Sequence, residues 1–268
     1  MNLRDKLTAF VKGIRTRYLR RGRGAPLLVL PGLLGRRADS VVEATESTHE
    51  GYVPDPPGFW ESDAPREALT VAWLGEWSGE FHGGVIGQRP VTAVAFSAGA
   101  TSLIRYAATH PGAIERLVLF EPVIRGRELP AWLQALMAAS AIPGTPQLIL
   151  KWAPQLVPLL PGLGHIGWKK RFRLVEGINS PRSACEFARS LRRWDATDDL
   201  RSLDIPVLLV RGSQESIVPH HTIASFRGQN ISHLELPGVG HFLNRAGQEQ
   251  VIEAVRDFIK PRRFSWSW

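Results

Sequence analysis

The residue best placed for chemistry is Ser97. It ends an apolar, strand-like stretch, residues 91–96, and a helix-like segment, residues 101–109, follows it closely. Its neighbours are small, including Ala95 and Gly99. A strand, a tight turn with serine at the apex and a helix form a nucleophile elbow, where crowding excludes large side chains. The pattern predicts a serine nucleophile for acyl transfer, and an ordinary strand–turn–helix junction is the alternative.

The chain around Ser97 alternates between strand-like and helix-like segments. Short apolar runs predict further strands at residues 27–30, 114–120, 203–210 and 231–236, and other stretches favour helices at residues 36–48, 66–81 and 248–259. Near the N-terminus, alternation with period two around Lys12 and Gly13 predicts a β-hairpin. Strands that alternate with helices predict an α/β protein, with a mostly parallel central sheet and helices on both faces.

Six motifs resemble those of the α/β-hydrolase family, and they occur in that family's order. They are the hairpin and strand over residues 17–32, P-D-P-P-G-F-W-E-S at 54–62, V-A-F-S-A-G at 94–99, H-P with R-L-V-L at 110–119, G-S-Q-E-S-I-V-P at 212–219 and G-V-G-H-F at 238–242. The resemblance covers nearly the whole chain. It implies the α/β-hydrolase fold with a helical lid, so we expect one domain, residues 1–268, with its core at 1–123 and 197–268 and the lid at 124–196.

The resemblance also implies a catalytic triad, in the order nucleophile, acid, base: Ser97, Glu215 and His241. A serine hydroxyl is a poor nucleophile until a base takes its proton, and imidazole titrates near neutral pH. Glutamate stands at position 215, where aspartate is usual. Some members place the acid after the preceding strand, where this chain has Glu121, so Glu215 is favoured and Glu121 is the alternative.

Two backbone N–H groups should form the oxyanion hole, and by position they belong to Leu33 and Ala98. The lid segment is rich in tryptophan. Trp132, Trp152 and Trp168 are candidates to line a pocket for an apolar acyl or aromatic group, although packing of the lid onto the sheet is the simpler use of such residues.

Composition narrows the function further. The formal charge is +8, but the arginines are scattered and form no nucleic-acid module, so we expect no nucleic-acid partner. No apolar run is long enough to span a bilayer and the N-terminus lacks a secretory pattern, so we expect a cytoplasmic protein without stable membrane insertion. Cys185 is the only cysteine. No pattern calls for a metal or cofactor, and the oligomeric state stays open.

The sequence favours a serine hydrolase that cleaves an ester, thioester or lactone through an acyl-enzyme. The serine argues against dehalogenase or epoxide-hydrolase chemistry, which in this fold uses an aspartate nucleophile. Two alternatives remain open. One is an acyltransferase, perhydrolase or cyclase on the same fold. The other is a non-catalytic binding protein, because Pro31, Ala95 and Glu215 depart from the commonest motifs.

Overall fold

The computed structural model describes residues 6–33, 38–142, 144, 148, 151 and 175–260. In this part of the chain an eight-stranded sheet has the order β1-β2-β4-β3-β5-β6-β7-β8. The strands are β1 (Lys6–Val11), β2 (Ile14–Gly22), β3 (Ala25–Leu30), β4 (His49–Pro54), β5 (Val91–Phe96), β6 (Ile114–Phe120), β7 (Val207–Gly212) and β8 (Ile231–Leu236). The hairpin β1–β2 and the β2–β4 pair are antiparallel, whereas every pairing from β4 to β8 is parallel. The predicted α/β class with a mostly parallel sheet is confirmed.

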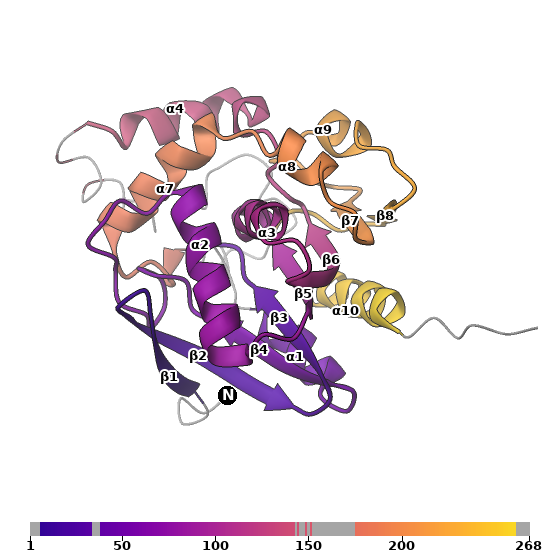
Figure 1. The fold of residues 1–268 in the computed structure, drawn as a ribbon. Coiled ribbons are helices and arrows are strands. Elements are labelled where there is room, and N and C mark those ends of the chain that lie inside the picture. Colours follow the sequence, from indigo (N-terminus) through magenta and orange to yellow (C-terminus); the bar gives the residue numbers. More distant parts are fainter. Residues whose placement is uncertain are drawn as a thin grey trace, which may run out of the picture.

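Helices cover both faces of the sheet (Figure 1). They are α1 (Asp39–Thr45), α2 (Val71–Phe81), α3 (Ser97–Thr109), α4 (Ala131–Ala139), α7 (Pro181–Arg193), α8 (Thr197–Arg201), α9 (His220–Ala224) and α10 (Arg245–Ile259). Single turns of other helix types lie at His82–Ile86 and Gly126–Glu128. None of the helices within the described ranges is long and apolar enough to cross a membrane.

Two apolar cores result from the alternation of side chains along the strands. Leu28 and Leu30 of β3 point into the core under α2 and α3, whereas Leu27 and Val29 point into the core under α1 and α10. Because both faces are covered, the central strands are apolar almost without interruption. This explains why short apolar runs located them in the sequence.

The structure differs from the expected elements at several places; for example, the strand expected at residues 203–210 is Val207–Gly212. The strand β4 was not predicted, because its sequence H-E-G-Y-V-P contains a charged residue and a glycine. A helix was expected at residues 36–48, and in the described part of this range the helix is α1, Asp39–Thr45. The strand β4 begins shortly after it, at His49. The helix expected from residue 66 begins at Val71, because Thr70 is extended and its side chain accepts a hydrogen bond from Trp73 N at 3.1 Å.

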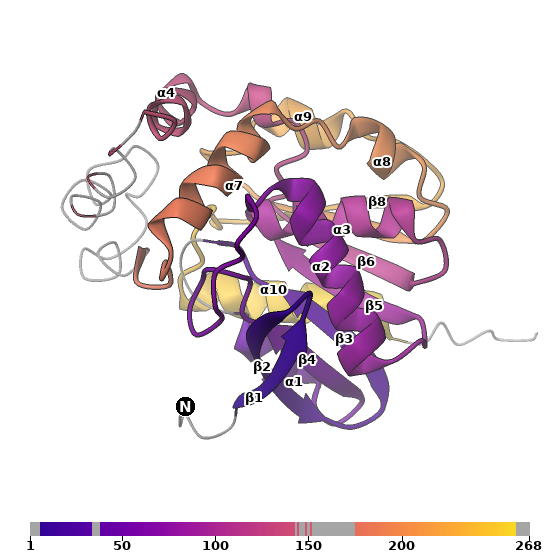
Figure 2. The ribbon, with the colours of Figure 1, turned by 60° about the vertical axis from the view of Figure 1, so that its left-hand side comes forward.

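The expected lid segment follows β6. Its described helices, α4 and α7, pack against each other. In both views they lie at the top of the molecule, above α2, α3 and the strands (Figures 1 and 2). Phe187 and Leu191 attach α7 to the larger core, and Met137 does the same for α4. The remaining part of the expected lid includes residues 152–174, which lie outside the described residues.

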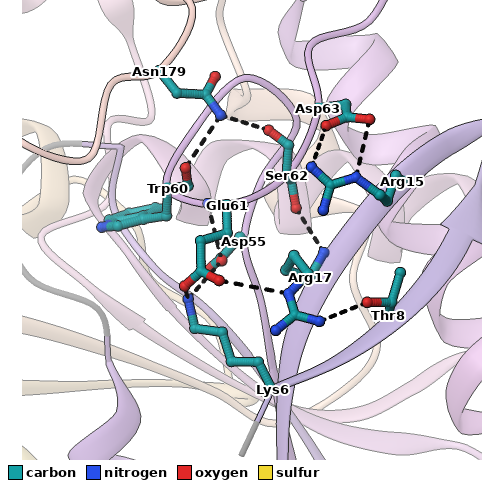
Figure 3. Close-up of polar contacts among 10 residues, drawn as sticks. All are labelled: Lys6, Thr8, Arg15, Arg17, Asp55, Trp60, Glu61, Ser62, Asp63 and Asn179. Atoms are coloured by element: carbon teal, nitrogen blue, oxygen red, sulfur yellow. Dashed lines mark hydrogen bonds and ion pairs between the residues drawn. The ribbon is translucent and has the colours of Figure 1, made fainter. Parts of the chain in front are cut away.

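A buried ion cluster fixes the loop that follows β4. Lys6 Nζ lies 3.1 Å from Asp55 Oδ2 and also contacts the Glu61 carboxylate, and the Arg17 guanidinium lies 3.5 Å from Glu61 (Figure 3). The side chains of Lys6 and Asp55 are 6% and 0% exposed. Charges this deeply buried are stable only when they are paired. The loop is therefore fastened to the hairpin β1–β2.

The same loop is also bonded to the chain that leads into α7. Trp60 N donates to Gly177 O at 2.6 Å. Asn179 Nδ2 donates to Trp60 O at 3.2 Å and to Ser62 O at 2.7 Å (Figure 3). Trp60 has a φ of +45°, in the left-handed region that tryptophan rarely adopts. Bonds on both sides of this residue hold the strained backbone. They connect Gly177 and Asn179, near the end of the expected lid segment, to the loop that follows β4.

We predict that Lys6→Met destabilises the protein strongly. The substitution removes the Lys6 ammonium from the buried Asp55 carboxylate, which costs about 3 kcal/mol. Urea unfolding at neutral pH measures the difference. Lys260→Met is the matched control, because its partner Asp257 and Lys260 itself are 64% and 69% exposed and such pairs contribute less than about 1 kcal/mol. Equal effects of the two substitutions would contradict the role given to the buried cluster.

Candidate active site

Ser97 occupies the turn between β5 and α3. The residue before it, Phe96, is extended, whereas Ser97 has a φ of +50° and begins the helix. A side chain at Gly99 would start 2.4 Å from Pro31 O, so the turn passes too close to the β3 end for anything larger. A serine held in this strained region presents its hydroxyl at the carboxyl edge of the sheet.

His241 meets Ser97 from the loop between β8 and α10. Ser97 Oγ lies 2.8 Å from His241 Nε2, and His241 Nδ1 lies 2.9 Å from Glu215 Oε2. The side chains of His241 and Glu215 are 7% and 0% exposed. With its proton on Nδ1, the imidazole donates to the carboxylate and accepts from the serine hydroxyl. These three residues, 144 positions apart at the extremes, thus form one hydrogen-bonded chain.

The loops that carry Glu215 and His241 are fastened to each other. Ser213 N donates to Leu236 O at 2.9 Å, and Gln214 N donates to Val239 O at 2.8 Å. A side chain at Gly212 would start 2.0 Å from Val239 O, so glycine is required where the two loops approach. The distance between the acid and the base is therefore set by backbone contacts.

Glu215 is ionised despite its burial. Burial raises the pKa of its carboxyl group, but three groups outweigh this effect: His241, through charge and a hydrogen bond, and the backbone N–H groups of Ile217 and Val218, so that the pKa falls to about 2. Sequence reasoning missed these two backbone donors. The signal for them was the short S-I-V-P stretch that lets the chain fold back over the glutamate.

Glu121 takes a different place. It follows β6 with a φ of +46°, it is fully buried, and its carboxyl group accepts a hydrogen bond from Gly212 N. Burial first, and then the charge of Glu215, raise the pKa of Glu121 to about 10. Of the two glutamates that the sequence left open, the structure brings Glu215, and not Glu121, to hydrogen-bond distance of His241.

Of the two residues expected at the oxyanion hole, Ala98 lies in the elbow itself and Leu33 follows the end of β3. Ala98 is the second residue of α3, so its N–H is among the helix-terminal donors that have no partner within the helix. Leu33 is buried in the larger core, and it is the last described residue before a gap at 34–37. The positive end of the α3 dipole lies at the N-terminus of this helix, next to Ala98.

The three tryptophans expected to line the pocket are only partly described. Trp132 is half-buried on α4, and Trp152 and Trp168 lie outside the described residues. In the described ranges, no three histidine, cysteine, aspartate or glutamate side chains are grouped so that they could hold a metal ion.

Comparison with solved structures finds the same architecture in several enzymes. A bromoperoxidase from Bacillus anthracis has a TM-score of 0.78 at 20% identity, over 96% of this chain and 100% of that one. An esterase from Thermogutta terrifontis with bound malate has a TM-score of 0.77 at 17% identity, over 94% and 97%. An E-2-(acetamidomethylene)succinate hydrolase has a TM-score of 0.76 at 17% identity, over 96% and 99%. At these identities the likeness concerns the fold.

Comparison of the sequence with curated proteins gave no match. The family model described as "Alpha/beta hydrolase family" matches residues 27–254, which is most of the chain and includes Ser97, Glu215 and His241. The chain therefore belongs to the alpha/beta hydrolase family.

Proposed function

We propose that this protein is a serine hydrolase that cleaves an ester, thioester or lactone through an acyl-enzyme. The observation that carries the proposal is the hydrogen-bonded chain from Ser97 Oγ through His241 to the buried Glu215 carboxylate. In this chain the serine has a base within 2.8 Å and the base has an acid that fixes its orientation. A serine with only a structural role at the end of a strand would need neither a base nor an acid that orients the base.

The reaction follows from these contacts. Ser97 Oγ attacks the substrate carbonyl carbon while His241 Nε2 takes the hydroxyl proton, and the charge of Glu215 stabilises the imidazolium that forms. His241 then gives the proton to the leaving alcohol or thiol, and the acyl group stays on Ser97. A water molecule, activated by the same imidazole, attacks the acyl-enzyme and releases the acid.

The tetrahedral intermediates place a negative charge on the former carbonyl oxygen. We assign its stabilisation to the N–H groups of Ala98 and Leu33, supported by the positive end of the α3 dipole. The left-handed turn at Ser97 favours this role, because it presents the serine next to the first N–H groups of the helix.

An apolar group in the substrate is favoured by the composition of α4. The helix reads A-W-L-Q-A-L-M-A-A, yet Met137 is its only buried residue and Leu136 is 39% exposed. An apolar surface of this kind on the expected lid is suited to an acyl chain or an aromatic ring. The substrate we propose is therefore a small molecule with such a group next to its carbonyl carbon.

We predict that a fluorophosphonate probe labels Ser97 in the folded protein. The probe reacts with serines that a base activates, so Ser97→Ala should abolish labelling and His241→Ala should lower its rate by at least about 10³-fold. Mass spectrometry of the labelled peptide identifies the residue. Ser102→Ala is the matched control, because Ser102 is a buried serine on the same helix whose hydroxyl has no hydrogen-bond partner among the described residues. A folded wild-type protein that takes no label would refute the proposal.

Replacement of the acid, Glu215, should lower the catalytic rate strongly without unfolding the protein. We expect Glu215→Gln to lower kcat for p-nitrophenyl esters by about 10³- to 10⁴-fold with little change in KM, because the amide no longer stabilises the imidazolium. Glu253→Gln removes an exposed carboxylate on α10 and should leave kcat unchanged. Comparable losses in both variants would argue against Glu215 as the acid of the triad.

A further inference from the structure

Glu121 is a buried acid that the proposed reaction does not use. One carboxyl oxygen, Oε1, accepts a hydrogen bond from Gly212 N. The other, Oε2, is buried and has no hydrogen-bond donor among the described residues. Native proteins rarely leave such an atom unpaired, because its desolvation costs about 1–3 kcal/mol. The position of Glu121 therefore needs an explanation.

The backbone around Gly212 connects Glu121 to the triad. Gly212 N donates to Glu121, and Gly212 O accepts from Glu215 N at 3.2 Å. Glu121 N in turn donates to Val210 O at 2.9 Å, across the β6–β7 pair. The carboxyl group of Glu121 thus braces the first residue of the turn that carries Glu215.

In the part of the chain that the structure describes, the Glu121 carboxyl group forms no ion pair with a lysine or arginine. The charged groups that act on it are Glu215 and Arg211, and the Arg211 guanidinium is bonded to Glu235 on β8 at 2.7 Å. Burial, and then the charge of Glu215 and a hydrogen bond shared with it, raise the pKa of Glu121 to about 10, whereas the pKa of Glu215 is about 2. The surroundings of the two carboxyl groups therefore favour a protonated Glu121 beside an ionised Glu215.

We propose that Glu121 is a positioning residue of the triad: a neutral carboxylic acid that accepts from Gly212 N with one oxygen and donates its proton to the Glu215 carboxylate with the other. It acts on His241 only through Glu215. The hydrogen bond draws charge from Glu215 and moderates the basicity of His241, and the contact with Gly212 fixes the turn. The effect on catalysis rests on the proposed function, but the protonation state does not.

The neutral state has a consequence for stability. In the unfolded chain Glu121 loses its proton above about pH 4.5, whereas in the folded protein it keeps it until about pH 10. The folded state therefore binds more protons between these values, and stability falls as pH rises through this window. Glutamine is neutral in both states, so it removes this loss.

The first experiment compares the melting temperatures of the wild type and Glu121→Gln at pH 5 and pH 8.5. We expect the variant to melt at least about 3 °C higher at pH 8.5 and within about 1 °C of the wild type at pH 5. Glu253→Gln, which removes an exposed carboxylate, should follow the wild type at both pH values. A Glu121→Gln variant that melts no higher than the wild type at pH 8.5 would overturn the neutral state.

The second experiment measures the pKa of His241 by NMR and the rate of fluorophosphonate labelling. Glu121→Gln keeps an acceptor and a donor, so we expect a His241 pKa within about 0.3 of the wild type and a labelling rate within about threefold. Glu121→Met loses both groups, so we expect a raised His241 pKa and labelling at least about tenfold slower. If Glu121→Met does not fold, Glu121→Asp, whose carboxyl group is withdrawn by one methylene, replaces it.

The outcomes separate this inference from the proposed function. A wild type that takes no label refutes the proposed function, and the melting and NMR measurements still decide the inference. An unchanged His241 pKa in Glu121→Met would overturn the positioning role, and a lowered one in Glu121→Gln would show that Glu121 is charged. The positioning role of Glu121 is supported if Glu121→Gln and Glu121→Met both give the expected results.

Discussion

The site depends on a single buried charge, the carboxylate of Glu215. An ionised carboxyl group with no exposed surface is stable only if its oxygens are hydrogen-bonded and its charge is balanced. His241 Nδ1 supplies one contact, and Ile217 N and Val218 N supply the others. The acid loop is thus folded around its own carboxylate. This loop in turn fixes the ring of His241, and the ring fixes the hydrogen bond to Ser97.

The parallel sheet brings these groups together from distant parts of the chain. Strands β5, β6, β7 and β8 are consecutive neighbours and run in one direction, so the loops that follow them meet at one edge. Ser97 follows β5, Glu121 follows β6, Glu215 follows β7 and His241 follows β8. Both glutamates therefore lie close to the histidine by topology alone. Hydrogen bonds, and not strand order, distinguish their roles.

This distinction marks the limit of what the sequence could predict. The strands at residues 114–120 and 231–236 were located to the residue, because buried strands have a clear apolar signature. The choice between Glu215 and Glu121 needed atomic geometry, since both residues follow central strands. The strand β4 escaped detection, because Glu50 and Gly51 interrupt its apolar pattern while pairing with β2 and β3 supports it. Long-range pairing of this kind leaves no local trace.

The three departures from the family's usual motifs are compatible with an intact site. Ala95 replaces a glycine, and its methyl group is fully buried in the larger core, so the elbow accommodates it. Pro31 lacks an N–H, but the oxyanion donors that we propose belong to Leu33 and Ala98, so no donor of that pair is lost. Glu215 is one methylene longer than aspartate, and its loop still places the carboxylate 2.9 Å from His241 Nδ1. A degenerate binding protein has no need to retain this geometry, and its persistence argues for catalysis.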